Sequence, residues 1–181
     1  MNAIARPDSL PRRRVLRLVA AGLASVGLAG CGFALRKAPT FAFQTIRLQG
    51  NEGTAVAREL REALQANGLQ VLSTATATAT ATQPAQVVLT VVIDQRERAV
   101  VGQTAAGQVR ELQLRTRFVF RLRTANEKTL IDDTELLLER DISFTETAVL
   151  SKDAEEAMLY RDMQGDIVQQ VLRRLAAVKS L

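Results

Sequence analysis

Few residues in this chain of 181 can do covalent chemistry. The single cysteine, Cys31, follows Leu28-Ala29-Gly30, and histidine is absent. The lack of histidine excludes Ser-His and Cys-His nucleophiles and histidine metal sites, and no glycine-rich phosphate loop occurs. The acidic pairs Asp132-Asp133 and Glu155-Glu156 follow no pattern typical of carboxylate catalysis. We therefore expect no enzyme, no cofactor and no metal site.

Cys31 closes a segment with the layout of an export signal. A basic stretch ending at Arg17 precedes twelve uncharged residues, Leu18 to Ala29, which is the order of a secretory signal. Twelve helical residues span about 18 Å, well short of the roughly 30 Å bilayer core. Leu28-Ala29-Gly30-Cys31 resembles a bacterial lipobox, in which the thiol is alkylated by diacylglycerol, the signal is cleaved before the cysteine, and the new amine is acylated. We predict that Cys31 is lipidated and anchors the mature chain to a membrane. The alternatives are a plain signal peptide with a chance cysteine, or a buried free thiol.

The residues around Cys31 also indicate to which membrane the lipoprotein is sent and what net charge the mature chain carries. Gly32, rather than aspartate, follows the cysteine, which resembles lipoproteins sent on to the outer membrane. The basic run Arg12 to Arg17 also resembles a twin-arginine signal, so the export route stays open. Removing residues 1–30 takes away five basic residues and one acidic residue, leaving 19 and 18, a net charge of +1. The basic character of the full chain is therefore not a nucleic-acid footprint.

The mature chain has the length of one domain. We expect a signal peptide over 1–30, a lipidated tether over 31–40 and a single α/β domain over 41–181. The Thr-Ala repeat over 74–82 is interpreted as a flexible, low-complexity loop.

Hydrophobic periodicity predicts two helices and a set of strands. The expected elements are strands at 43–48, 69–73, 85–93, 109–124 and 129–142, and helices at 54–67 and from 153 to about 178. The first strand, helix and strand predict a parallel pair. Thr54 and Asn67-Gly68 are expected to cap the first helix, and Asp153 with Glu156 a capping box on the second. In the strand over 85–93, Val87, Leu89, Val91 and Ile93 are expected on one face.

The strand over 109–124 carries a second candidate site. Leu112, Leu114, Thr116, Phe118, Phe120 and Leu122 alternate with Arg115, Arg117, Arg121 and Arg123, interrupted only by Val119. Keeping both apolar sets on one face favours a register that pairs Arg115 with Glu139, Arg121 with Asp133, Phe118 with Leu136 and Phe120 with Thr134. The arginines then form either cross-strand ion pairs on a wet face, each worth well under about 1 kcal/mol, or a surface that meets anionic groups or the wall of a partner.

Several short motifs, taken in order, resemble the LptE family of lipopolysaccharide-assembly lipoproteins. They are Cys31-Gly32-Phe33 with Leu35-Arg36, Gly107-Gln108 before Glu111-Leu112-Gln113-Leu114, and Ser151-Lys152-Asp153 before a helix ending Val171-Leu172-Arg173-Arg174-Leu175. The resemblance covers nearly the whole mature chain. It implies an α+β, two-layer sandwich with two helices on one face of a mixed, mostly antiparallel sheet. It also implies that the chain is lodged as a plug in the β-barrel of a partner, LptD, and that the two insert lipopolysaccharide into the outer leaflet.

The resemblance further implies two contacts with lipopolysaccharide, through basic residues near a strand turn and before the last helix. Lys152 matches the second position, and a solvated loop lysine near Asp153 is the alternative of equal weight. The first position reads Ala105-Ala106, which leaves Arg110 as the nearby basic residue. The alternative function is a free-standing lipid- or glycan-binding lipoprotein without a barrel partner. The sequence favours the barrel partner, because strands that alternate Arg with Leu and carry few aromatic residues line an apolar pocket poorly.

Overall fold

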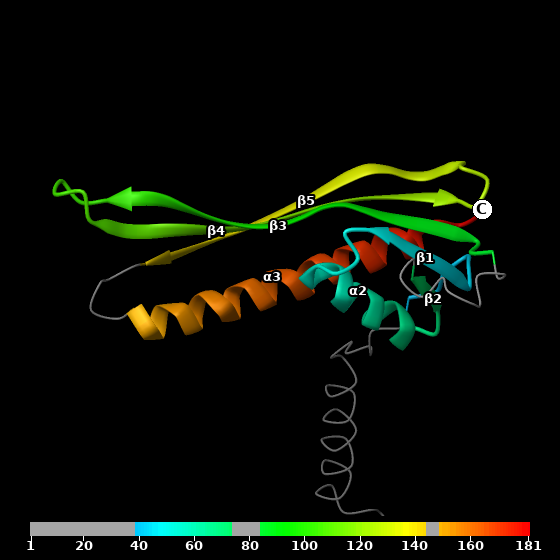
Figure 1. The fold of residues 1–181 in the computed structure, drawn as a ribbon, viewed down its shortest axis with the longest axis horizontal. Helices are drawn as coiled ribbons and strands as arrows, with labels where there is room; N and C mark the ends of the chain where they lie inside the picture. The colour runs from blue at the N-terminus through cyan, green and yellow to red at the C-terminus, as the bar shows by residue number, and fades with distance from the viewer. Residues whose placement is uncertain (1–38, 74–83, 144–148) are drawn as a thin grey trace, which may run out of the picture. The chain divides into compact units, whose positions relative to one another are not determined.

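The computed structural model describes residues 39–73, 84–143 and 149–181, coloured in Figure 1. Its elements are β1 (Thr45–Gly50), α2 (Ala55–Ala66), β2 (Gln70–Ser73), β3 (Val87–Gln103), β4 (Val109–Thr124), β5 (Thr129–Ser143) and α3 (Val149–Ala177). Cys31, most of the expected tether and the Thr-Ala repeat lie outside the described residues.

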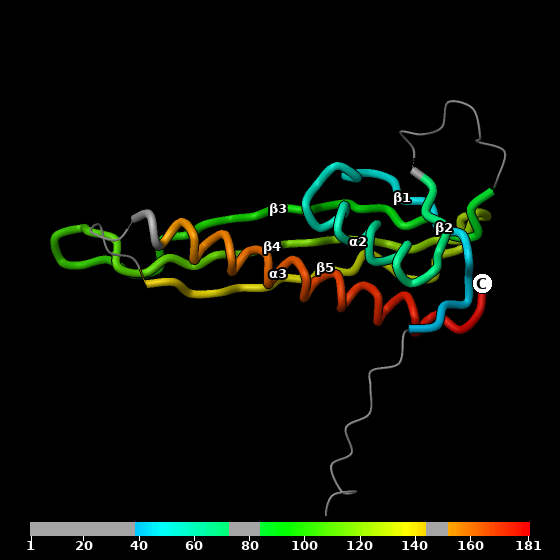
Figure 2. The backbone as a smooth tube through the Cα atoms, turned by 90° about the horizontal axis from the view of Figure 1, so that it is seen from below, coloured from blue at the N-terminus to red at the C-terminus, as the bar shows by residue number. Residues whose placement is uncertain are grey.

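The five strands form one mixed sheet in the order β2-β1-β3-β4-β5. β1 runs parallel to β2 and to β3, whereas β3, β4 and β5 are antiparallel neighbours. Both helices lie on one face of this sheet and contact each other (Figures 1 and 2). The expected α+β sandwich and the parallel pair β1–β2 are thus confirmed.

The core lies between the sheet and the two helices and has two clusters. The larger one joins Ile46, Leu60, Leu89 and Phe120 with the C-terminal half of α3, and all four side chains are fully buried. The smaller one joins Leu112, Leu114, Ile142, Tyr160 and Met163. These residues recur at the expected spacing of two on the strands and three or four on the helix. Burial of each large apolar side chain stabilises the fold by about 1.5–3 kcal/mol before entropy is counted.

The limits of α2 follow largely from its sequence. Thr54 occupies the N-cap position, but its hydroxyl donates to the carbonyl of Asn51 at 2.7 Å and caps no helical amide. The backbone amide of Val56 instead donates to Oδ2 of Asp94 on β3, at 3.1 Å. Asn67 is the C-cap as expected, and Gly68 follows with a φ of +84°, a conformation that favours glycine.

β3 is longer than expected, because it continues past Ile93 to Gln103. A bulge between Val91 and Ile93 moves Ile93 to the other face, where it pairs with Val119, so its expected place beside Val91 is wrong. Beyond the bulge, Asp94 pairs with Phe118 and shares the helix-covered face. The charged residues after Ile93 therefore continue the strand rather than end it.

The register of β4 with β5 is confirmed through Arg115↔Glu139, Phe118↔Leu136 and Phe120↔Thr134. It shifts after Phe120, but Arg121 still reaches Asp133 at 3.1 Å. The ion pairs expected from the register are therefore present.

α3 starts four residues earlier than expected, at Val149. Asp153 is therefore inside the helix, so the expected capping box with Glu156 is wrong, because an N-cap residue needs a non-helical backbone. Arg174 lies in the last turn, as expected for a cation at the negative end of a helix. Within the described residues, no helix has the length and apolar character needed to cross a membrane.

Candidate interaction surface

The sheet face away from the helices carries the arginine stripe, which we define as Arg115, Arg117, Arg121 and Arg123 of β4. Each member forms an ion pair: Arg115–Glu139 at 2.9 Å, Arg117–Glu135 at 2.7 Å, Arg121–Asp133 at 3.1 Å and Arg123–Glu127 at 3.0 Å. The stripe is therefore a charge-balanced row and not a positive patch.

The pair formed by Arg117 has the best geometry in the stripe. Its Nε and one Nη donate to the two carboxylate oxygens of Glu135, at 2.7 and 3.3 Å. The hydrogen bond and the charge of Glu135 raise the pKa of Arg117 above its ordinary value. Glu135 reaches Arg117 diagonally, since the residue directly opposite is Leu137.

Aliphatic side chains fill the spaces between these charges. Val119 is buried although it lies on this outer face, and Ile93 pairs with it across the strands. Leu137 is 48% exposed. No described element lies over this face of the sheet (Figure 1). It is therefore an open surface that combines paired charges with aliphatic contacts.

Lys152 lies near the start of α3 rather than in a loop before it. Its Nζ is 2.7 Å from Oε2 of Glu155 and 3.2 Å from Oγ of Ser143, the last residue of β5. Its side chain is 19% exposed. Its acidic partner is thus Glu155 and not the neighbouring Asp153.

Arg110, the second residue of β4, is exposed and has no ion pair within the described ranges. The β3–β4 hairpin end and the start of α3 lie at the same end of the sheet (Figure 1). The fold therefore brings the regions of Arg110 and Lys152 to one end without joining the two side chains.

A polar row on the helix-covered face was missed by the sequence analysis. Arg96 lies over the ring of Tyr160, 5.2 Å from its centroid, and also donates to Gln164. The Tyr160 hydroxyl donates to the carbonyl of Glu97 at 2.6 Å, and burial raises its pKa. Arg98 pairs with Glu156 at 3.2 Å. These contacts join α3 to β3. They could not be predicted from alternation, because the bulge after Val91 changes which residues of β3 face the helix.

No group of three or more Cys, His, Asp or Glu side chains that could hold a metal occurs among the described residues. The described surfaces present ion pairs, exposed aliphatic side chains such as Leu137, and exposed cations such as Arg110.

These features define a class of protein: an open two-layer α+β domain with one sheet face uncovered. The family model described as lipopolysaccharide-assembly, LptE, matches residues 43–175. The chain belongs to this LptE family, which confirms the expected resemblance and places the chain in lipopolysaccharide assembly.

Solved structures agree with this assignment. Lipoprotein B of Nitrosomonas europaea, solved by NMR in solution, is 30% identical, has a TM-score of 0.66, and the match covers 81% of this chain and 91% of that one. Two crystal structures share the fold. The rare lipoprotein B of Shewanella oneidensis is 19% identical with a TM-score of 0.59, over 74% of this chain and 94% of that one. A minor lipoprotein of Acinetobacter baumannii is 20% identical with a TM-score of 0.58, over 76% and 94%. No curated protein sequence matched the chain.

Proposed function

We propose that this chain is an outer-membrane lipoprotein, anchored through acyl groups on Cys31 and facing the periplasm. In this proposal it lodges in an LptD-like β-barrel, supports the assembly of that barrel, and acts with it in moving lipopolysaccharide to the outer leaflet. Membership of the lipopolysaccharide-assembly family supports the general role. The lipobox-like residues that end at Cys31 support the anchor.

The observation that carries the barrel partnership is the uncovered sheet face. All four arginines of the stripe are paired with acids, so the face presents both signs of charge with Leu137 and Val119 between them. The lumen of an outer-membrane barrel is lined by polar residues. A charge-balanced surface suits such a wall, because its groups can exchange ion-pair and hydrogen-bond partners without leaving a buried charge alone.

We also propose that lipopolysaccharide contacts the end of the domain that carries Lys152 and Arg110. Arg110 is exposed and unpaired among the described residues, so it can take a phosphate without giving up an ion pair. Lys152 would have to exchange Glu155 for the phosphate. Arg110 is therefore expected to contribute more to this contact than Lys152.

The test is to isolate the lipidated chain from detergent-solubilised outer membrane and to identify and weigh what comes with it by mass spectrometry. A large β-barrel in one-to-one ratio that withstands detergent is expected. The variants Arg110→Glu and Lys152→Glu should keep the barrel and reduce bound lipopolysaccharide. Isolation of the chain alone, or with lipid only, would contradict the barrel partnership and favour a free-standing lipid-binding lipoprotein.

A further inference from the structure

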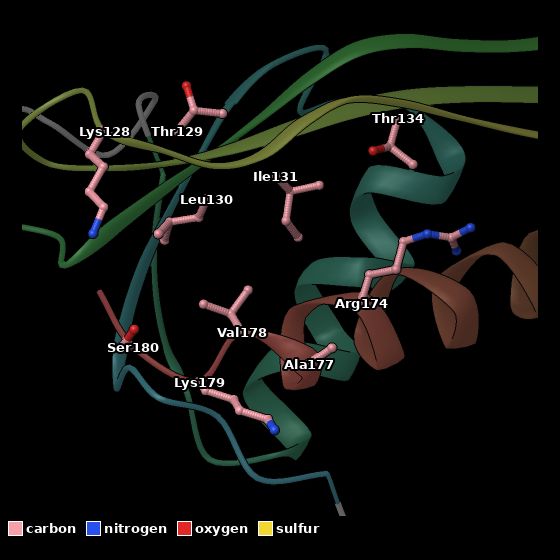
Figure 3. Close-up of a pocket in the computed structure, with 10 residues that line it drawn as sticks. All are labelled: Lys128, Thr129, Leu130, Ile131, Thr134, Arg174, Ala177, Val178, Lys179 and Ser180. Carbon is pink, nitrogen blue, oxygen red and sulfur yellow. The ribbon is translucent and has the colours of Figure 1, made fainter.

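A groove opens between the start of β5 and the end of α3 (Figure 3). Its volume is about 540 Å³, within the range of small-molecule sites. Its floor includes Leu130, Ile131 and Val178, which are partly buried and pack on the larger core cluster. Its rim carries three cations, Lys128, Arg174 and Lys179.

The charges around this groove are not balanced. Lys128, Arg174 and Lys179 form no ion pair with any described residue, unlike every arginine of the stripe. No aspartate or glutamate lines the groove. The end of α3 contributes about half a negative charge. The three cations exceed this, so the groove keeps a net charge of about +2.5. An anionic group with an apolar part fits this combination.

The chain enters the domain beside this groove. The ring centroids of Phe41 and Phe43 are 5.8 Å apart. Phe43 belongs to the larger core cluster and Phe41 packs against it, so these residues fix the point where the chain enters the domain. The first described residues, in blue, run past the end of α3 (Figures 2 and 3). Seven residues lie between Cys31 and Pro39, so the eight steps from one Cα to the next give a reach of about 28 Å at most.

That reach keeps the entry point, and the groove beside it, close to the membrane that would hold the proposed anchor. α3 has 29 residues and is therefore about 44 Å long. The start of α3, with Lys152, thus lies farther from the entry point than the tether can span. The groove is at the near end, within reach of the membrane that holds the acyl chains.

We propose that this groove binds the phosphate headgroup of an anionic phospholipid in the membrane that carries the anchor. The cations on the rim take the phosphate, and the aliphatic floor meets the glycerol and the first methylenes of the acyl chains. This inference rests on the proposed lipidation of Cys31. It concerns the opposite end of the domain from the proposed lipopolysaccharide contact.

The test uses the mature, acylated chain in vesicles of phosphatidylcholine, with or without one third phosphatidylglycerol, and follows amide hydrogen exchange. Exchange at residues 128–134 and 174–181 is expected to slow in the anionic vesicles, by about fivefold for each cation that contacts a headgroup. The double variant Lys128→Gln with Lys179→Gln should lose most of this effect. The matched control, Arg58→Gln with Arg161→Gln, removes the same charge from exposed helix positions and should keep it.

Three results would overturn the inference while leaving the anchor intact. They are equal exchange in both kinds of vesicle, equal loss in the control variant, and the same protection when inorganic phosphate is added to phosphatidylcholine vesicles. The intact mass of the chain reports the anchor separately. A chain without acyl groups would contradict the anchor and this inference together.

Discussion

The carboxylate of Asp94 on β3 caps the N-terminus of α2, because its Oδ2 accepts the backbone amide of Val56 at 3.1 Å. Thr54, the residue next to the helix in sequence, does not do so. A carboxylate at this position satisfies one free amide and lies at the positive end of the helix dipole. The contact joins the edge of the helical layer to the central strand of the sheet.

We predict that Asp94→Ala lowers the free energy of unfolding by about 1 kcal/mol, the usual contribution of an N-cap side chain. Asp94→Asn should cost less, since the amide oxygen still accepts the hydrogen bond. Urea denaturation followed by circular dichroism measures both. Gln95→Ala, at the next and exposed position, is the control and should leave stability nearly unchanged. Equal stability of Asp94→Ala and the unmodified domain would refute this role.

Gly50 should tolerate no side chain. It has a φ of +86°, and a Cβ at this position would lie 2.3 Å from the carbonyl oxygen of Val91. Both atoms belong to the backbone or are fixed to it, so the sheet would have to move. We expect Gly50→Ala to destabilise the domain by about 3 kcal/mol or more. Gly53→Ala, with nothing within 4 Å of its Cβ, is the control, and thermal melts of both variants decide the point.

The buried hydroxyl of Tyr160 predicts a loss of stability in alkali. Burial raises its pKa above the ordinary value of about 10, so the folded state holds the phenolic proton more tightly than the unfolded state. This stabilisation is complete below pH 10 and disappears as the pH rises through the folded-state pKa.

Tyr160→Phe should remove that alkaline dependence. Near pH 8 it should also cost about 1 kcal/mol, because the carbonyl of Glu97 loses its donor. Denaturation curves between pH 7 and pH 11 test both effects. A variant with the same alkaline slope as the unmodified chain would assign that slope to other groups.

Variants of the ion pair Arg117–Glu135 test its contribution to stability separately from its contribution to partner binding. Changing both residues to glutamine keeps the net charge and removes the ion pair, and should cost less than about 1 kcal/mol because the pair is half exposed. The same double change at Arg98–Glu156, on the helix-covered side, is the matched control. If the sheet face meets the barrel, only the first double variant should reduce the yield of barrel on isolation of the chain. Equal yields would remove the stripe from the interface.

Much of the fold followed from alternation in the sequence. The limits of β4 and its register with β5 were predictable because arginines and large apolar residues alternate along β4, and a shift of one residue would bury charge. The core face of α3 was predictable from the spacing of residues such as Met163 and Ile167. In both elements the large apolar side chains must face the core, and this requirement sets which residues are buried.

The rest depended on features that alternation does not reveal. The bulge between Val91 and Ile93 shifts the alternation of side chains along β3 by one residue. Strict alternation therefore puts Ile93 on the wrong face, and it does not predict that Asp94 faces the helices. Because α3 starts early, Lys152 lies beside Ser143 at the end of β5. The two residues are nine positions apart, so neither helical nor strand periodicity predicts their contact. The cations of the groove come from β5 and the end of α3, and only the tertiary structure brings them together.

Photo-crosslinking from the exposed side chain of Leu137 tests the central claim most directly. This residue lies on the uncovered sheet face next to the arginine stripe and is 48% exposed, so a benzophenone amino acid there should not disturb the core. Irradiation of cells is expected to give one heavy adduct whose peptides come from the lumen wall of an outer-membrane β-barrel. An anchored, folded chain that gives no adduct, or adducts with lipid alone, would contradict the barrel partnership.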